Sequence, residues 1–152
     1  NSTTINVFSW AKIQPSENEY DFTELDEIVD TLTKEDVQIV MATSTGALPA
    51  WMVHRYPEVA RTDFEGRHHK FGHRHNACPN SPVFQKYAKR LAEKLAEIFR
   101  EKGCPTAEAC EDVEEAFKKA LAAKGEDGML FCVGSLYLVG EIKTLILQGV
   151  GK

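Results

Sequence analysis

The stretch Val37-Gln-Ile-Val-Met-Ala-Thr43 (VQIVMAT) decides the fold class, because its apolar residues are nearly continuous. A strand of this kind is expected where helices cover both faces of a parallel sheet. An earlier β-branched and aromatic stretch, residues 3–9 (TTINVFS), predicts a first strand. Between the two strands, Asp21 and Glu24 have the spacing of a capping box, and apolar residues at helical spacing follow, so we expect a helix over residues 22–34.

The remaining sequence extends this alternation. Residues 44–80 form a long connection with one short helical piece at 50–56, and a long helix begins at Ser81-Pro82 and ends at Gly103. Two further strands are predicted at 106–110 and 128–133, each followed by a helix. We therefore expect one α/β domain over residues 1–152, made of four consecutive β-α units in a mostly parallel sheet. An open flavodoxin-like or Rossmann-like sheet is the preferred interpretation, and half of a (β/α)8 barrel is the alternative.

Composition limits the function classes. The chain has 152 residues, with 18 Lys and Arg against 23 Asp and Glu, a net charge of −5 that argues against general nucleic-acid binding. Its longest apolar run, residues 129–133, is too short to span a bilayer, and its first residues lack a signal-peptide pattern. The four cysteines form no CxxC pair, which favours a reducing, cytoplasmic compartment. We expect no nucleic-acid or membrane partner, and a monomer or a homodimer paired through an exposed sheet edge.

Several motifs in the first two thirds of the chain resemble glycoside hydrolase family 42, the (β/α)8-barrel β-galactosidases. The motifs, in family order, are FSWAKIQPSENEYDF (8–22), LDEIVD (25–30), IVMATSTGALPAWM (39–52), YPEVARTDFEGR (56–67) and HNACPNSP (75–82). The resemblance covers about residues 1–97 and implies the second and third β-α units of the barrel.

The later motifs resemble a different family. LAEIFREKGCP (95–105), DVEEAFKKAL (112–121) and GSLYLVGEIKTLI (134–146) are similar to the C-terminal domain of folylpolyglutamate synthases. The two resemblances meet inside one helix, at residues 91–97. We therefore interpret the chain as an engineered chimeric scaffold, with a glycosidase-derived part at 1–94, a synthase-derived part at 95–152 and no intact catalytic site. The first alternative is a fragment of a β-galactosidase-like hydrolase, and the second is a residual sugar-, anion- or metal-binding module.

The first resemblance implies two catalytic glutamates on barrel strands that have no counterpart here, so we expect no catalytic residue in this chain. Glu19 imitates the family's Asn-Glu-Tyr acid motif, but it precedes a helix and is interpreted as a loop carboxylate. By resemblance, Arg74 aligns with an arginine that contacts galactose, while Phe8 and Trp10 follow the first strand and are candidate sugar-contacting residues. A purely structural packing role is the alternative for Trp10.

Two weaker ligand sites complete the predictions. Cys78 aligns with a zinc-binding cysteine of some family members, and imidazoles nearby add to a weak metal site, with zinc as its only candidate cofactor. The predicted metal-site residues are His68, His69, His73, His75 and Cys78. The turn at Gly134-Ser135 opens a helix after a strand, so it is a weak candidate for holding an anion. No P-loop of the type that binds ATP occurs in the sequence.

Overall fold

The structure, a computed structural model, describes residues 1–69, 72, 77–132 and 136–150. Its contacts divide the chain into two compact units, Asn1–Ala92 and Glu93–Lys152. The helix α4, Pro82–Glu101, runs through the boundary between them. The expectation of one domain over residues 1–152 stays a prediction.

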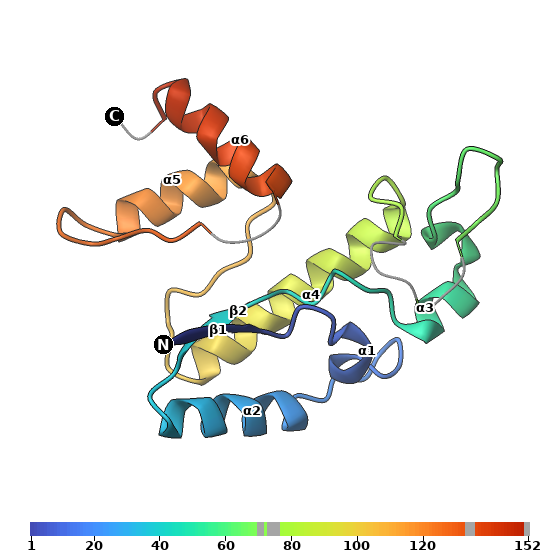
Figure 1. Ribbon diagram of the computed structural model, residues 1–152, viewed down its shortest axis with the longest axis horizontal. Helices are drawn as coiled ribbons and strands as arrows, with labels where there is room; N and C mark the ends of the chain where they lie inside the picture. Colours follow the sequence, from blue (N-terminus) through green and yellow to red (C-terminus); the bar gives the residue numbers. More distant parts are fainter. Residues whose placement is uncertain (70–71, 73–76, 133–135, 151–152) are drawn as a thin grey trace. The chain divides into compact units, whose positions relative to one another are not determined.

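The first unit is built on a parallel strand pair. The strand β1 (Ser2–Ile5) pairs with β2 (Gln38–Met41) in a register that places Ser2 opposite Gln38 and Ile5 opposite Met41. The helix α2 (Thr23–Lys34) connects the two strands and contacts β2 (Figure 1). The predicted parallel strand–helix–strand unit is therefore confirmed.

Both strands are shorter than the sequence predicts. After Ile5 the chain enters the left-handed region at Asn6, where φ is +68°, and this turn ends β1. Asparagine tolerates this conformation better than most residues with a side chain. The predicted capping box is wrong in detail: Phe22 occupies the N-cap of α2, Asp21 accepts a 2.9 Å bond from the Thr23 N–H, and Glu24 pairs with Lys12 instead.

Short helices enclose the core of the first unit. They are α1 (Trp10–Ile13), α3 (Ala50–Arg55) and the 3-10 turn η1 (Pro57–Val59), and α3 contacts η1. Fully or almost fully buried side chains come from all of these elements and from α4: Trp10, Ile13, Met52, Val59, Tyr87 and Leu91. This core fixes the segment that follows β1.

The second unit is helical in the part that the structure describes. The helix α5 (Val113–Ala123) contacts α6 (Leu136–Leu147), and the Asp112 carboxylate caps α5 by accepting a 2.7 Å bond from the Glu115 N–H. Within the described ranges, no helix combines the length and apolar character needed to cross a membrane.

The predicted strands at 106–110 and 128–133 are not confirmed. Residues 106–110 and 128–132 lie outside regular structure, and the only strands among the described residues are β1 and β2. The apolar side chains of Met129 and Phe131 are 77% and 74% exposed, the opposite of a central strand. A strand is stable only when its backbone pairs with a neighbouring strand, and among the described residues neither segment has such a pairing. The open four-unit sheet is therefore not found.

Candidate functional site

The chain segments that follow β1 and β2 meet at one edge of the sheet. The Asn6 amide donates a 2.9 Å bond to the carbonyl of Ala42, and the Ser44 hydroxyl donates a 2.6 Å bond to the carbonyl of Asn6. Phe8 lies directly against Gly46. These residues lie beyond the carboxyl ends of parallel strands, which is where α/β proteins bind their ligands.

The predicted sugar-contacting residues are placed very differently. Phe8 is 42% exposed at this edge, whereas Trp10 is fully buried. The Trp10 indole donates a 2.8 Å bond to Gln14 Oε1, and its ring centre lies 6.1 Å from that of Phe84. Trp10 therefore contributes packing in this structure, while the side chain of Phe8 is partly exposed. Arg74 lies outside the described residues, and the substrate roles stay predictions.

A carboxylate with several donors holds the segment after α1 in place. Glu17 accepts hydrogen bonds from the hydroxyl groups of Tyr87 and Tyr56, the second at 3.0 Å, and forms a 2.5 Å ion pair with Arg55. Tyr87 itself is 1% exposed and packs edge-on to Trp51, with ring centres 5.2 Å apart. The cluster therefore connects the loop after α1 with α3 and α4.

The cluster perturbs the acidity of its members. The hydrogen bond from Tyr87 is the largest cause that lowers the pKa of Glu17, and the Tyr56 hydroxyl and the charges of Arg55 and Lys86 act in the same direction. Burial is the largest cause that raises the pKa of Tyr87, and the adjacent Glu17 carboxylate adds to it. At neutral pH the cluster thus contains an ionised Glu17 carboxylate beside the neutral phenol of Tyr87.

We expect the acid side of the stability profile to depend on Glu17. Because its pKa is lower in the folded state, Glu17 stabilises the fold above its unfolded pKa, and this contribution is lost as the pH falls below about 5. Asp21 and Asp63 also have lowered pKa values, so the wild type loses stability in acid for more than one reason. Urea unfolding of the wild type and Glu17→Gln between neutral pH and acid isolates Glu17, because the difference between them should shrink as the pH falls. A difference independent of pH would contradict the expectation.

Close packing at the strand-end edge predicts that replacement by alanine has opposite effects on stability at Gly46 and at Gly140. A Cβ on Gly46 would lie 2.9 Å from Phe8 Cε1 and 3.1 Å from the Val7 carbonyl. Around a Cβ on Gly140, apart from the neighbouring backbone of α6 itself, no atom of the described residues lies within 4 Å. Gly46→Ala should therefore lower the free energy of unfolding by about 1–3 kcal/mol. Gly140→Ala, inside α6, should raise it by about 0.5–1 kcal/mol. Denaturant unfolding checks both, and equal effects of the two substitutions would contradict the packing argument.

The predicted metal and anion sites are only partly described. His68 Nδ1 lies 3.3 Å from the Ala60 carbonyl and 3.4 Å from the Thr62 hydroxyl, while the Cys78 backbone N–H donates to Val59. No group of three metal-type ligands occurs among the residues that the structure describes. The residues His73, His75, Gly134 and Ser135 lie outside the described ranges, so both sites stay predictions. Glu19 is exposed in the turn before α2, where the Ser16 hydroxyl donates to it at 2.9 Å.

Sequence reasoning missed two functional features of this edge. It did not identify Asn6 as the buried residue that joins the two strand ends, although an asparagine directly after a strand is a signal for a left-handed turn. It also did not indicate that Tyr87 donates to Glu17. No local signal predicts that pair, because the two residues are 70 positions apart.

The first unit contains a parallel strand pair connected by a helix. This is a β-α repeat of the kind found in (β/α)8 barrels, in which ligands bind beyond the carboxyl ends of the strands. The chain belongs to the β-galactosidases of glycoside hydrolase family 42, whose family model matches residues 1–124. β-Galactosidase BgaA of Planococcus sp. is 53% identical over 98 residues, which cover 64% of this chain and 14% of that protein. β-Galactosidase LacA of Lactobacillus acidophilus is 41% identical over 138 residues, covering 82% of this chain and 20% of that protein.

Solved structures agree with this assignment. The crystal structure of a β-galactosidase from Bacillus circulans sp. alkalophilus matches all of this chain with a TM-score of 0.64 and 41% identity, over 23% of its own length. The chain thus spans about a fifth of the relatives that it matches. These neighbours are consistent with the half-barrel alternative of the fold prediction.

The interpretation as an engineered chimeric scaffold is wrong. The family match runs through the proposed junction at residues 91–97 and continues to residue 124, and the matched crystal structure covers the entire chain. None of these comparisons supports a part derived from a folylpolyglutamate synthase. The alternative of a β-galactosidase-like hydrolase fragment fits the findings better.

Proposed function

We propose that this chain forms one wall of the sugar site of an enzyme that hydrolyses β-galactosides. The observation that carries the proposal is the meeting of the two strand ends within a family 42 β-galactosidase segment, joined by Asn6, Ala42 and Ser44. Phe8 offers an exposed ring at this edge. Arg74, by resemblance, supplies a guanidinium to the sugar hydroxyls. The catalytic carboxylates that the chemistry needs are expected from other strands of the barrel.

A segment exchange tests this proposal most directly. Residues 1–124 of this chain replace the matching segment of the Bacillus circulans enzyme, to which the whole of this chain aligns over 23% of that enzyme's length. The exchanged enzyme should hydrolyse a chromogenic β-galactoside with a kcat/KM within about tenfold of its parent, a cost of about 1.4 kcal/mol. A folded exchange enzyme without activity would overturn the proposal.

Two substitutions in the exchanged enzyme locate the sugar contacts. Phe8→Ala should lower kcat/KM by about tenfold, and Arg74→Ala by about 10–100-fold, the value of a hydrogen bond to a charged group. Phe64→Ala is the matched aromatic control, because Phe64 is 97% exposed on a loop away from the strand ends. If Phe8→Ala and Phe64→Ala lower kcat/KM equally, Phe8 does not contact the sugar.

A further inference from the structure

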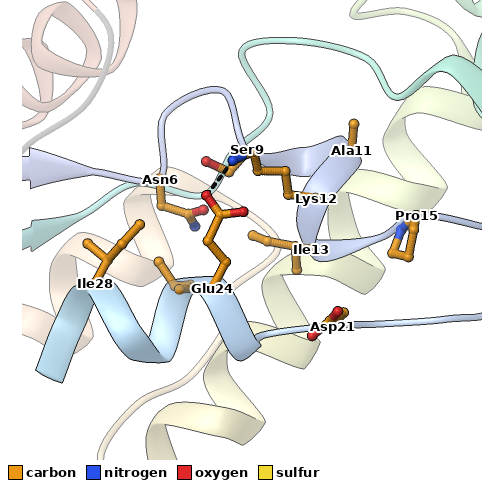
Figure 2. A pocket seen from close by; sticks show the side chains of 10 residues that line it. Asn6, Ser9, Ala11, Lys12, Ile13, Pro15, Asp21, Glu24 and Ile28 are labelled. Carbon is orange, nitrogen blue, oxygen red and sulfur yellow. Dashed lines mark hydrogen bonds and ion pairs between the residues drawn. The ribbon is translucent and has the colours of Figure 1, made fainter.

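Two hollows among the described residues differ in the groups that border them. In the first unit, the hollow between the segment after β1 and α2 is bordered by Lys12 and Glu24, which form an ion pair with each other (Figure 2). In the second unit, a groove of about 370 Å³ lies between α5, α6 and residues 130–132. Met129 directly precedes this groove segment, and its thioether is a group that oxidants can modify.

The side chain of Met129 lies on the open side of its segment. Leu130 and Cys132 are half-buried and line the groove beside Phe117, whereas Met129 is 77% exposed. Phe131 also borders the groove, but it is 74% exposed. Exposure that alternates along the chain is typical of an extended segment with one covered side. The sulfur of Met129 is therefore accessible to a small solute while the chain is folded.

The other two methionines of the chain are covered to different degrees. Met52 in α3 is fully buried, and Met41 at the end of β2 is half-buried. An oxidant reaches a buried sulfur only when the structure opens locally, whereas an exposed sulfur reacts directly. The accessibility of the three thioethers thus falls from Met129 through Met41 to Met52.

We propose that Met129 is a site of reversible oxidation by hydroperoxides, and that it reacts before the other methionines. The sulfur lone pair attacks one peroxide oxygen, the O–O bond breaks, and the second oxygen leaves with a proton as water or an alcohol. The thioether loses two electrons and becomes a sulfoxide, and the peroxide gains them. Methionine sulfoxide reductases reverse the step: two thiols become a disulfide, and the sulfoxide oxygen leaves as water. The inference is independent of the function proposed above, because it uses neither Phe8 nor Arg74.

Oxidation of Met129 should leave the fold intact. A sulfoxide is more polar than a thioether, so it disrupts a core when it forms inside one. Because Met129 is 77% exposed, its sulfoxide stays in water. Met52 packs in the core of the first unit, where the same change would remove apolar packing. Met129 therefore consumes peroxide without the loss of stability that oxidation of Met52 would cause.

Peptide mapping of the full chain after exposure to dilute hydrogen peroxide tests the order of reaction. Mass spectrometry follows the addition of one oxygen atom to the peptide that contains each methionine. We expect Met129 to react at least about tenfold faster than Met52, which corresponds to an opening free energy of about 1.4 kcal/mol at the buried residue, with Met41 between them. Equal rates at Met129 and Met52 would overturn the proposal.

Reduction and unfolding test the other parts of the proposal. The two epimer-specific methionine sulfoxide reductases, supplied with dithiothreitol, should return the Met129 peptide to its original mass. The midpoint of urea unfolding should be the same before oxidation and after oxidation of Met129 alone. A sulfoxide that resists both reductases, or a lower midpoint after oxidation of Met129, would contradict a reversible and harmless modification.

Met129→Leu and Met52→Leu are matched variants, because each removes one thioether and nearly conserves the side-chain volume. In Met129→Leu, no methionine peptide should gain oxygen during the fast phase of the wild type. In Met52→Leu, the fast phase at Met129 should be unchanged. A fast phase that persists on another methionine in Met129→Leu would overturn the assignment. If Met52→Leu does not fold, the rates of the three methionine peptides in the wild type decide.

Discussion

Trp10→Ala is expected to lower the free energy of unfolding of the first unit by about 3–5 kcal/mol. The indole is fully buried, and its removal leaves a cavity beside Phe84. It also leaves Gln14 Oε1 without the 2.8 Å bond from the indole N–H, and Gln14 itself is fully buried. Urea unfolding followed by far-ultraviolet circular dichroism measures the loss.

Phe8→Ala is the matched control for this prediction. Phe8 lies two residues earlier in the same segment but is 42% exposed, so its loss should cost clearly less stability than the loss of Trp10. If the two substitutions cost the same, Trp10 is not the anchor of the segment. The expected contrast assigns the larger part of the segment's stability to Trp10.

The different burial of Phe8 and Trp10 separates two residues that the sequence motif treats alike. Phe8 and Trp10 lie two positions apart after a strand, and the resemblance makes both of them candidate sugar-contacting residues. Only the fold shows that α1 turns the indole inward, onto Gln14 and Phe84, while the phenyl ring stays at the edge beside Gly46. Helix α1 is four residues long, too short to be recognised from periodicity.

The elements that sequence predicts best are those with a local cause. The helices α2 and α4 have long apolar stripes, and their observed bounds lie close to the predicted ones. The strands predicted at 106–110 and 128–133 would need neighbouring strands to pair with, and the local sequence pattern does not show whether such neighbours exist. Apolar character alone does not make a strand, and Met129 and Phe131 are exposed without one.

The chimeric interpretation failed for a related reason. Part of its evidence, beside the motif at 134–146, was the amphipathic helix pattern of LAEIFREKG and DVEEAFKKAL in residues 95–121. Such a pattern is required by any surface helix that packs on a core, so it recurs in unrelated families and does not indicate ancestry. The motifs of residues 8–82 include irregular loops with tryptophan, proline and glycine, which few folds share, and that part of the resemblance is confirmed by the family match.

Tyr87→Ala should destabilise the first unit about as much as the loss of Trp10, by about 3–5 kcal/mol. Tyr87 is 1% exposed, and its truncation removes the edge-on contact with Trp51 and a donor to Glu17. Tyr87→Phe separates these effects, because it keeps the ring and removes only the hydroxyl. We expect Tyr87→Phe to cost about 1.5–3 kcal/mol, the range for a hydrogen bond to a charged group.

Tyr56→Phe provides the internal comparison. The Tyr56 hydroxyl also donates to Glu17, at 3.0 Å, but its side chain is less deeply buried than that of Tyr87. Its loss should therefore cost less than the loss of the Tyr87 hydroxyl, and the double variant should cost more than the sum, because Glu17 then keeps only Arg55. Denaturant unfolding of the three variants at neutral pH measures the coupling. Strict additivity would contradict the coupling and would mean that the two phenols act on Glu17 independently.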